Sequence, residues 1–320
     1  MKKEKTVRRN EPVSRRFLCL LLALLCALPS LAGGEVSTGF VVTDENTDYP
    51  PMEYEPLPFS TRKSVVYESD TLIYTIESFR LDTVTCLLTK VWVKDPERQI
   101  RKANAPWGES LANPLDLAKQ VPGAVLATNA SGYITRTYPE IPENYPGESQ
   151  DYYFTTLGSL VITDGEILRR LDGVPFWGLA LSDNGITLYR GTDNETVLAS
   201  QPVQTWSFYE TCAMQVGGVD VLPEEGTWPM AKEHHPRSVI ARVNRNNYLM
   251  LHVPNREDSY GLSLYRINRF FSAHFEPEWV YNLDGGWSTA LIYKTQEKNA
   301  RLTRLAPNWQ PVADILCFTE

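Results

Sequence analysis

The sequence predicts an α+β fold, a strand-rich single domain with a few packed helices. Short runs of β-branched and aromatic residues recur along the chain between turn residues, whereas only two segments carry the features of helices. The 320 residues are 42 % hydrophobic and 22 % charged, a composition typical of a globular chain that buries a sizeable core. The sequence contains no internal repeat, so one domain of mixed strands and helices is expected.

Residues 1–32 are predicted to be an export signal and not part of the fold. Seven Lys and Arg precede an apolar run at 17–28, and Ser30-Leu31-Ala32 fits a cleavage site. The run is shorter than the roughly 20 residues of a membrane span, which favours cleavage over an uncleaved N-terminal anchor. The chain is therefore expected to be exported, and either secreted or attached to the outer face of the cytoplasmic membrane by this segment. Residues 33–62 are rich in Pro and predict an extended linker, and residues 63–320 form the predicted domain.

The expected strands follow one another along this domain. Each is a run of β-branched, aromatic or other apolar residues bounded by turn residues. They cover 65–67, 72–76, 84–93, 123–128, 160–163, 185–189, 239–243, 248–253, 280–283 and 315–318. The dipeptides Asp164-Gly165, Asp172-Gly173 and Asn184-Gly185 mark turns between them.

Two helices are predicted from their first residues. Asn113-Pro114 combines an Asn N-cap with Pro at the first helical position, and the helix that follows is short. A second helix starts at Ser263, and its apolar residues Leu264, Ile267 and Phe271 lie on one face. This spacing predicts that the second helix packs on a sheet.

Charge and cysteine content exclude several classes of protein. Residues 1–32 carry seven basic and two acidic residues, and the remainder carries 24 basic against 37 acidic residues, a net charge of −13. An acidic body argues against a nucleic-acid partner, which needs a basic face. Cys86, Cys212 and Cys317 are an odd number, so at least one thiol is unpaired, and Cys86 and Cys317, in apolar strand-like runs, are predicted to be buried thiols. No His or Cys spacing indicates a metal site, so no cofactor is assigned, although carboxylates and Asn leave a divalent cation open.

Polar residues lie at the ends of predicted strands at four places, which are the candidate site. These are the segment 128–133, Arg237 after Pro236, Arg256 after the strand at 248–253, and the segment 281–289. In the last, Asp284 follows an apolar strand and precedes Gly285 and Gly286, whose N–H groups would suit an anion. The alternative for this segment is a tight turn capped by Asp and Ser, which composition alone favours.

Read in order, these segments resemble the phosphodiester glycosidase family, whose bacterial members are often labelled exopolysaccharide-biosynthesis proteins. The resemblance covers about residues 64–318. Its most specific motif is Asn282-Leu283-Asp284-Gly285-Gly286-Trp287-Ser288-Thr289. The other motifs lie at 127–133, 159–165, 182–188, 236–241, 253–256, 259–264 and 311–316. The chain departs from the family pattern at Ala130-Ser131, at Pro254-Asn255 and at Trp287, where the family has glycines or Asp-Gly.

The resemblance implies an exported hydrolase that cleaves the glycosidic C–O bond of a sugar-1-phosphodiester in cell-envelope or extracellular glycans. Asp284 would be the catalytic carboxylate, and Arg237 and Arg256 would clamp the phosphate. The expected carbohydrate or sugar-phosphate ligand would contact Asn129, Ser131, Tyr133, Gly285, Gly286, Trp287 and Ser288. A second carboxylate is usual in glycosidases, and Glu210 and Asp258 are the candidates. The alternative is a non-catalytic carbohydrate-binding or cell-envelope protein on the same fold, because every departure falls at a predicted site residue.

Overall fold

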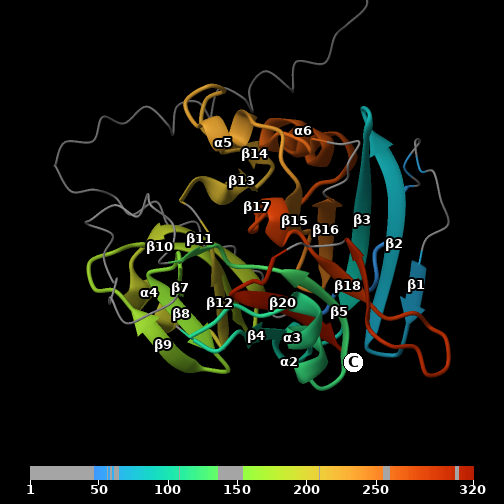
Figure 1. Ribbon diagram of the computed structural model, residues 1–320, viewed down its shortest axis with the longest axis horizontal. Helices are drawn as coiled ribbons and strands as arrows, with labels where there is room; N and C mark the ends of the chain where they lie inside the picture. The colour runs from blue at the N-terminus through green and yellow to red at the C-terminus, as the bar shows by residue number, and fades with distance from the viewer. Residues whose placement is uncertain are drawn as a thin grey trace, which may run out of the picture. The chain divides into compact units, whose positions relative to one another are not determined.

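The computed structural model describes residues 47–55, 57, 60, 65–107, 109–135, 154–208, 210–254, 260–306 and 310–320. The predicted export signal, most of the predicted linker, Arg256 and Asp258 lie outside these residues. The described chain consists mainly of strands, with a few short helices (Figure 1). This confirms the predicted strand-rich α+β fold.

The largest sheet has eight strands in the order β1-β2-β3-β16-β15-β17-β13-β14. Its members are β1 (Val65–Glu68), β2 (Leu72–Leu81), β3 (Val84–Val93), β16 (Asn247–Val253), β15 (Arg237–Arg242), β17 (Trp279–Asn282), β13 (Ala213–Val216) and β14 (Val219–Asp220). The central strand β16 pairs antiparallel with β3 and β15, placing Leu251 opposite both Leu88 and Val239. Every residue of β16 is buried, which explains why its sequence is nearly continuous in apolar residues.

A second sheet has five strands in the order β19-β18-β5-β20-β4. These are β19 (Thr303–Ala306), β18 (Leu291–Tyr293), β5 (Ala124–Asn129), β20 (Asp314–Thr319) and β4 (Ile100–Asn104). The side chains of β20 point alternately to the two faces of this sheet, as expected for a strand between two layers. Leu316 and Phe318 join the core shared with the eight-stranded sheet, whereas Ile315 and Cys317 join a cluster on the other face.

Smaller sheets and hairpins complete the strands. A three-stranded sheet has the order β11-β10-β12, with β11 (Gly185–Thr192), β10 (Phe176–Ser182) and β12 (Gln204–Ser207). Two hairpins pair β6 (Tyr133–Thr135) with β7 (Phe154–Thr156), and β8 (Leu160–Thr163) with β9 (Glu166–Arg170). The turn at Asp164-Gly165 has positive φ at both residues and joins β8 to β9 as predicted. Sequence reasoning missed several strands, among them β4, β10, β12 and β18.

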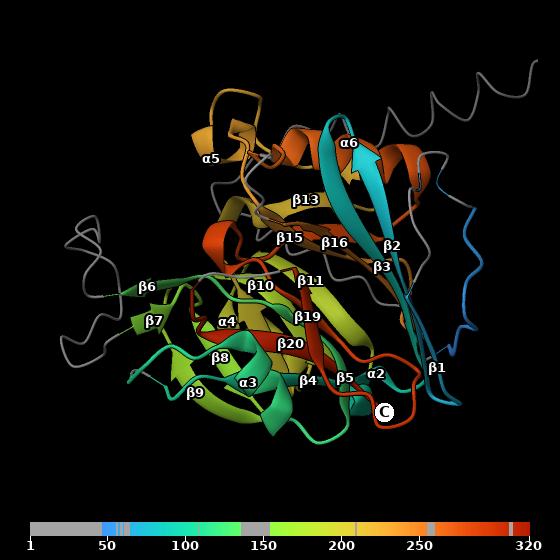
Figure 2. The same ribbon diagram turned by 45° about the vertical axis from the view of Figure 1, so that its right-hand side comes forward.

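The two large sheets stack between helices (Figure 2). Helix α6 (Leu264–His274) covers one face of the eight-stranded sheet, where its Ile267 and Phe271 share a cluster with Leu88 and Leu251. The five-stranded sheet covers the opposite face. Helix α3 (Pro114–Gln120) lies on the outer face of that second sheet, where Leu117 packs with the Ile315 and Cys317 cluster. The core therefore lies mainly between the two sheets.

The helix starts follow their predicted caps. The side chain of Asn113 accepts a hydrogen bond from the N–H of Leu115, and Ser263 accepts one from the N–H of Arg266. The remaining helices are α2 (Pro96–Gln99), α4 (Asn194–Ala199), α5 (Pro229–Lys232) and the 3₁₀ turns η1 (Glu210–Cys212) and η2 (Gly286–Ser288). Among the described residues, no helix combines the length and the apolar character needed to cross a membrane. The thiols of Cys86 and Cys317 are buried, as predicted, Cys212 is buried as well, and the three form no disulfide with one another.

The described part of the predicted linker lies against the domain. The N–H of Tyr49 donates to Asn246 Oδ1 at 2.9 Å, and Trp92 Nε1 donates to the carbonyl of Tyr49 at 2.8 Å. Asn247 Nδ2 donates to the carbonyl of Pro50 at 3.0 Å, and Asn247 Oδ1 accepts from the N–H of Met52 at 3.1 Å. We call residues 47–55 the strap. It is extended, as its prolines predict, but the turn before β16 holds it in place.

Candidate active site

The candidate site lies where ends of strands from the two large sheets meet. Asn129 ends β5 of the five-stranded sheet, Ser238 lies near the start of β15, and Asp284 follows β17. Ser238 Oγ donates to Asn129 Oδ1 at 2.7 Å, and Asn129 Nδ2 donates to the carbonyl of Asp284 at 2.6 Å. The N–H of Asp284 donates to the carbonyl of Ala130 at 2.9 Å. These bonds join the two sheets and fix the backbone of Asp284, so the structure brings Asn129 and Asp284 together.

Asn129 and Ser131 lie beneath the site and not on its surface. Asn129 is fully buried, and its Oδ1 also accepts the N–H of Ala290 at 2.9 Å. Ser131 is buried as well. Its Oγ accepts the N–H of Ser207 at 3.2 Å. Because their polar groups are occupied inside the protein, both residues position the site and do not offer the direct sugar contacts that were predicted.

Asp284 is the carboxyl of the site whose pKa is raised toward neutrality. The residue as a whole is partly exposed, but its carboxyl group is buried, and Oδ1 accepts the N–H of Gly285 at 2.9 Å. Burial raises the pKa of Asp284 from 3.8 to about 7, and the negative charge of Asp314 adds to this effect. Hydrogen bonds from Ser288 and Gly285 act in the opposite direction. A carboxyl with a pKa near 7 can both accept and donate a proton at neutral pH.

A buried ion pair lies close to Asp284, and sequence reasoning missed it. Lys102 Nζ lies 3.1 Å from Asp314 Oδ2, and both side chains are almost completely buried. Lys102 Nζ also donates to the carbonyl of Thr205 at 2.7 Å, and Asp314 Oδ1 accepts the N–H of Ser131 at 2.7 Å. Half of the signal was present in the sequence, because Asp314 interrupts the apolar run 312–318, whereas Lys102 lies in the largely polar segment Ile100–Asn104. A buried charge of this kind needs a partner of opposite charge.

Arg237 is anchored to the protein backbone. Its Nε donates to the carbonyl of Leu262 at 3.3 Å, and its Nη2 donates to the carbonyls of Met230 and Glu233. Burial lowers the pKa of Arg237 to about 10. In the part of the chain that the structure describes, Nη1 is the nitrogen of this guanidinium that makes no hydrogen bond. Nε and Nη2 of Arg237, which were predicted to clamp a phosphate, therefore bind the backbone of Leu262 and of α5 and its C-cap. Among the described residues, Nη1 has no such partner and is left for a ligand.

The Gly285-Gly286 segment is a tight turn and not an open anion nest. The N–H of Gly285 donates to the side chain of Asp284, and the N–H of Gly286 donates to the carbonyl of Pro236 at 2.8 Å. A Cβ at Gly285 would lie 2.8 Å from that same carbonyl, so only glycine fits there. Both N–H groups are occupied, and the predicted contacts of these groups with an anion are not formed. The capped turn is the interpretation that the structure supports.

The rim of the site consists of Trp287, Tyr133 and Gln310. The indole of Trp287 is 56 % exposed. The Tyr133 hydroxyl donates to the carbonyl of Pro311 at 2.9 Å. Gln310 Nε2 donates to Tyr133 Oη and to Ser288 Oγ, both at 3.0 Å, and thereby links the two predicted contact residues. Sequence reasoning missed Gln310, since nothing in its local sequence distinguishes it from a surface residue.

His252 supports the site from below. Its Nε2 lies 2.8 Å from Thr128 Oγ1, and β16 places it opposite Ser238. Burial lowers the pKa of His252 to about 3, so the ring is neutral. The remaining predicted carboxylates and cation cannot be located, because Arg256, Asp258 and the side chain of Glu210 lie outside the described residues. In the described segments, no three His, Cys, Asp or Glu side chains are grouped so that they could hold a metal ion.

Comparisons with known proteins agree with this fold. The catalytic domain of zebrafish N-acetylglucosamine-1-phosphodiester alpha-N-acetylglucosaminidase, auto-inhibited by its pro-peptide, superposes with a TM-score of 0.56 and 15 % identity over 82 % of this chain and 88 % of that one. A hypothetical protein from Synechocystis has a TM-score of 0.50 and 14 % identity over 81 % of this chain and 64 % of that one. These identities show the fold alone. The search of curated proteins found no match.

The sequence itself identifies the family. Residues 122–319, more than half of the chain, match the family model described as phosphodiester glycosidase. This segment contains β5, β15, β17 and β20, and thus Asn129, Arg237, Asp284 and Asp314. The chain belongs to the phosphodiester glycosidase family.

Proposed function

We propose that the chain is an exported hydrolase that cleaves the anomeric C–O bond of a sugar-1-phosphodiester in extracellular or cell-envelope glycans. Family membership supports the coarser statement that it is a glycosidase-type hydrolase with a carbohydrate-type substrate. The predicted signal at residues 1–32 supports export. The observation that carries the proposal is Asp284, a partly exposed residue whose buried carboxyl has a pKa of about 7 and which is held at the junction of two sheets.

The proposed reaction uses Asp284 as a general base. A water molecule attacks the anomeric carbon and gives its proton to the Asp284 carboxylate, while the C–O bond breaks and its electron pair stays on the phosphate oxygen. The phosphodiester is a weakly basic leaving group, so it needs little help from an acid. A pKa near 7 suits proton transfer better than direct nucleophilic attack, for which an ionised carboxylate of low pKa is usual.

The other residues have supporting roles in this reaction. Asp314 is fully buried, and its charge adds a small contribution to the raised pKa of Asp284, whose main cause is burial. Asn129 and Ser238 hold the Asp284 backbone, and Ser288 holds its carboxylate. Arg237 Nη1 is the proposed contact to the phosphate.

The test is hydrolysis of a panel of sugar-1-phosphodiesters that begins with N-acetylglucosamine-1-phosphodiesters, the class named for the zebrafish enzyme. We expect turnover by the parent chain, a loss of at least 100-fold in Asp284→Asn and unchanged turnover in Asp183→Asn, an exposed control. The kcat/KM of the parent should rise with pH around pH 7, because the ionised form of Asp284 is the active one. An Asp284→Asn variant that keeps full turnover would contradict the assigned base.

The exposed indole of Trp287 favours a second candidate, a carbohydrate-binding protein without catalysis. A flat apolar ring beside the polar turn at Asp284 offers a stacking surface for a sugar. This candidate predicts glycan-array binding by the parent that Trp287→Ala abolishes and Trp287→Phe retains, without turnover of any phosphodiester. Turnover that depends on Asp284 would exclude it.

A further inference from the structure

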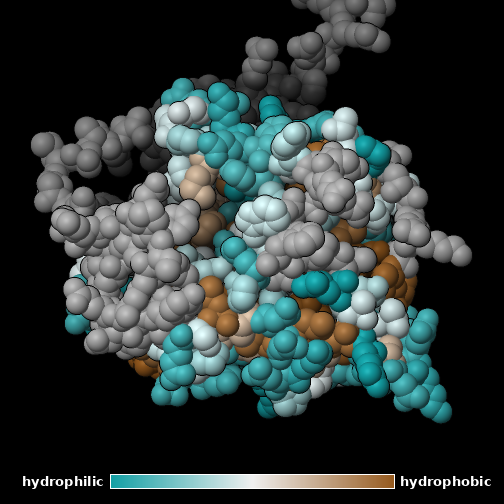
Figure 3. All heavy atoms as spheres, in the orientation of Figure 1, coloured by the Kyte–Doolittle hydropathy of each residue, from teal (hydrophilic) through white to brown (hydrophobic). Residues whose placement is uncertain are grey.

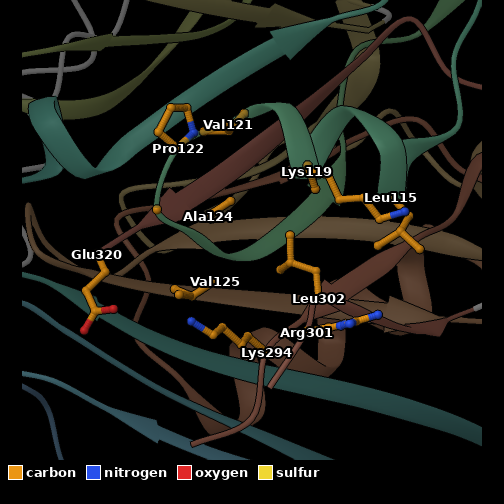
Figure 4. Close-up of a pocket in the computed structure, with 12 residues that line it drawn as sticks. Leu115, Lys119, Val121, Pro122, Ala124, Val125, Lys294, Arg301, Leu302 and Glu320 are labelled. Atoms are coloured by element: carbon orange, nitrogen blue, oxygen red, sulfur yellow. The ribbon is translucent and has the colours of Figure 1, made fainter. Parts of the chain in front are cut away.

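A second pocket lies at the opposite end of β5 from the candidate active site (Figure 4). Its volume is about 650 Å³, within the range of small-molecule sites. The pocket begins at Ala124 and Val125, the first residues of β5, whereas Asn129 is the last. Helix α3 forms one side, and Lys294, Arg301 and Leu302 from the segment between β18 and β19 form another. The pocket is therefore separate from the site around Asp284.

Much of the pocket lining is apolar. Leu115 and Val121 lie on the α3 side, Val125 lies on the strand, and Leu302 lies across from them (Figure 4). Figure 3 shows apolar surface between polar residues in this region, around α3 and β18. No aromatic side chain lines the pocket, so it lacks the stacking surface that a sugar ring prefers.

Two cations at this pocket have no partner in the fold. Lys119 pairs with Asp116 at 2.9 Å, and the carboxylate of Glu320 accepts the Tyr67 hydroxyl at 2.8 Å. By contrast, the side chains of Lys294 and Arg301 make no hydrogen bond or ion pair with the described parts of the chain. Residues 33–320 carry a net charge of −13, so these two cations beside the apolar lining are opposite in sign to the chain as a whole.

We propose that this pocket binds a single-chain amphiphilic anion, a hydrocarbon chain that ends in a phosphate or carboxylate. Lys294 and Arg301 would bind the headgroup, since ammonium and guanidinium groups bind such oxyanions. The hydrocarbon would lie along Leu115, Val125 and Leu302, where its burial from water is favourable. The ligand is a single molecule taken from solution, because one pocket of this size in an acidic domain does not suit an anionic membrane surface.

The experiment measures binding of octyl phosphate, below its micelle concentration, to the whole chain by titration calorimetry. Octyl glucoside keeps the chain and removes the charge, and inorganic phosphate keeps the charge and removes the chain. We expect octyl phosphate to bind at least tenfold more tightly than either. The double variant Lys294→Gln/Arg301→Gln should lose at least tenfold in affinity, and the matched control Lys298→Gln, in the same segment, should not.

The parent and all variants contain the apolar run at 17–28, so binding of octyl phosphate to that run would not differ between them. All substituted side chains are at the surface, and circular dichroism checks that the variants fold. Equal affinity of the double variant and the parent would overturn the proposal, as would octyl glucoside binding as tightly as octyl phosphate. Binding to phosphatidic acid vesicles without binding of octyl phosphate would assign the cations to a membrane surface and overturn it as well.

Discussion

Replacement of Asp284 by Asn should stabilise the protein, and more so at high pH. The pKa of Asp284 is raised from 3.8 to about 7 in the folded protein. As the pH rises through this interval, the unfolded chain loses the proton first and the folded protein holds it, so the free energy of unfolding falls. Because the pKa is raised by about 3, the free energy of unfolding above pH 7 is lowered by about 4 kcal/mol. About 2.5 kcal/mol of this cost develops between pH 5 and pH 8.

Asn keeps the size of Asp and an oxygen for the N–H of Gly285, but it never carries the buried charge. Urea unfolding of the parent and Asp284→Asn at pH 5 and pH 8 measures the difference. We expect the stability advantage of the variant to be about 2.5 kcal/mol larger at pH 8 than at pH 5. Asp183→Asn, at an exposed site, should show no such change. An advantage that is equal at both pH values would refute the raised pKa and the acid–base role built on it.

Three further changes test the surroundings of the site. Lys102→Met leaves Asp314 buried without its partner and should lower the free energy of unfolding, measured in urea, by about 3–5 kcal/mol. The double variant Lys102→Met/Asp314→Leu should regain most of this stability. A Lys102→Met variant as stable as the parent would contradict the ion pair. Asn129→Ala removes the hydrogen bonds between the sheets and should lower the free energy of unfolding by about 3 kcal/mol and kcat by at least tenfold. A change confined to KM would instead make Asn129 a ligand contact. Asn247→Ala should release the strap, lowering the stability by about 1–2 kcal/mol and opening residues 47–55 to limited proteolysis. Unchanged cleavage of the strap would show that Asn247 does not hold it.

Local signals explain which features could be predicted from the sequence. Asn113 and Ser263 begin helices because their side chains cap the first turn, an interaction that spans two or three residues. The segment 279–283 before Asp284 is apolar except for Asn282, and a glycine pair follows Asp284, which is also a local pattern. The order of these segments along the chain carried the resemblance to the family, and the match to the family model confirms that resemblance.

Long-range contacts explain what could not be predicted. Lys102 and Asp314 are neighbours because β4 and β20 pair in one register, and neither strand specifies that register alone. The N–H of Gly286 is occupied because the carbonyl of Pro236 lies against it, a contact between distant segments. Asn129 resembles a polar strand end open to a ligand, and only the packing of the second sheet shows that it is buried. The positions of Asn129 and Asp284 at strand ends could thus be predicted from the sequence, whereas which of their groups are occupied inside the protein could not.

The strap has a consequence for the order in which the chain assembles. Tyr49 bonds to Asn246, 197 residues further along the chain. Contacts of such separation form late, since a loop of that length must close first. During synthesis, the strap cannot dock until the turn before β16 has been made. Docking of residues 47–55 would thus be a late step of folding, and these residues would be open to a protease until then.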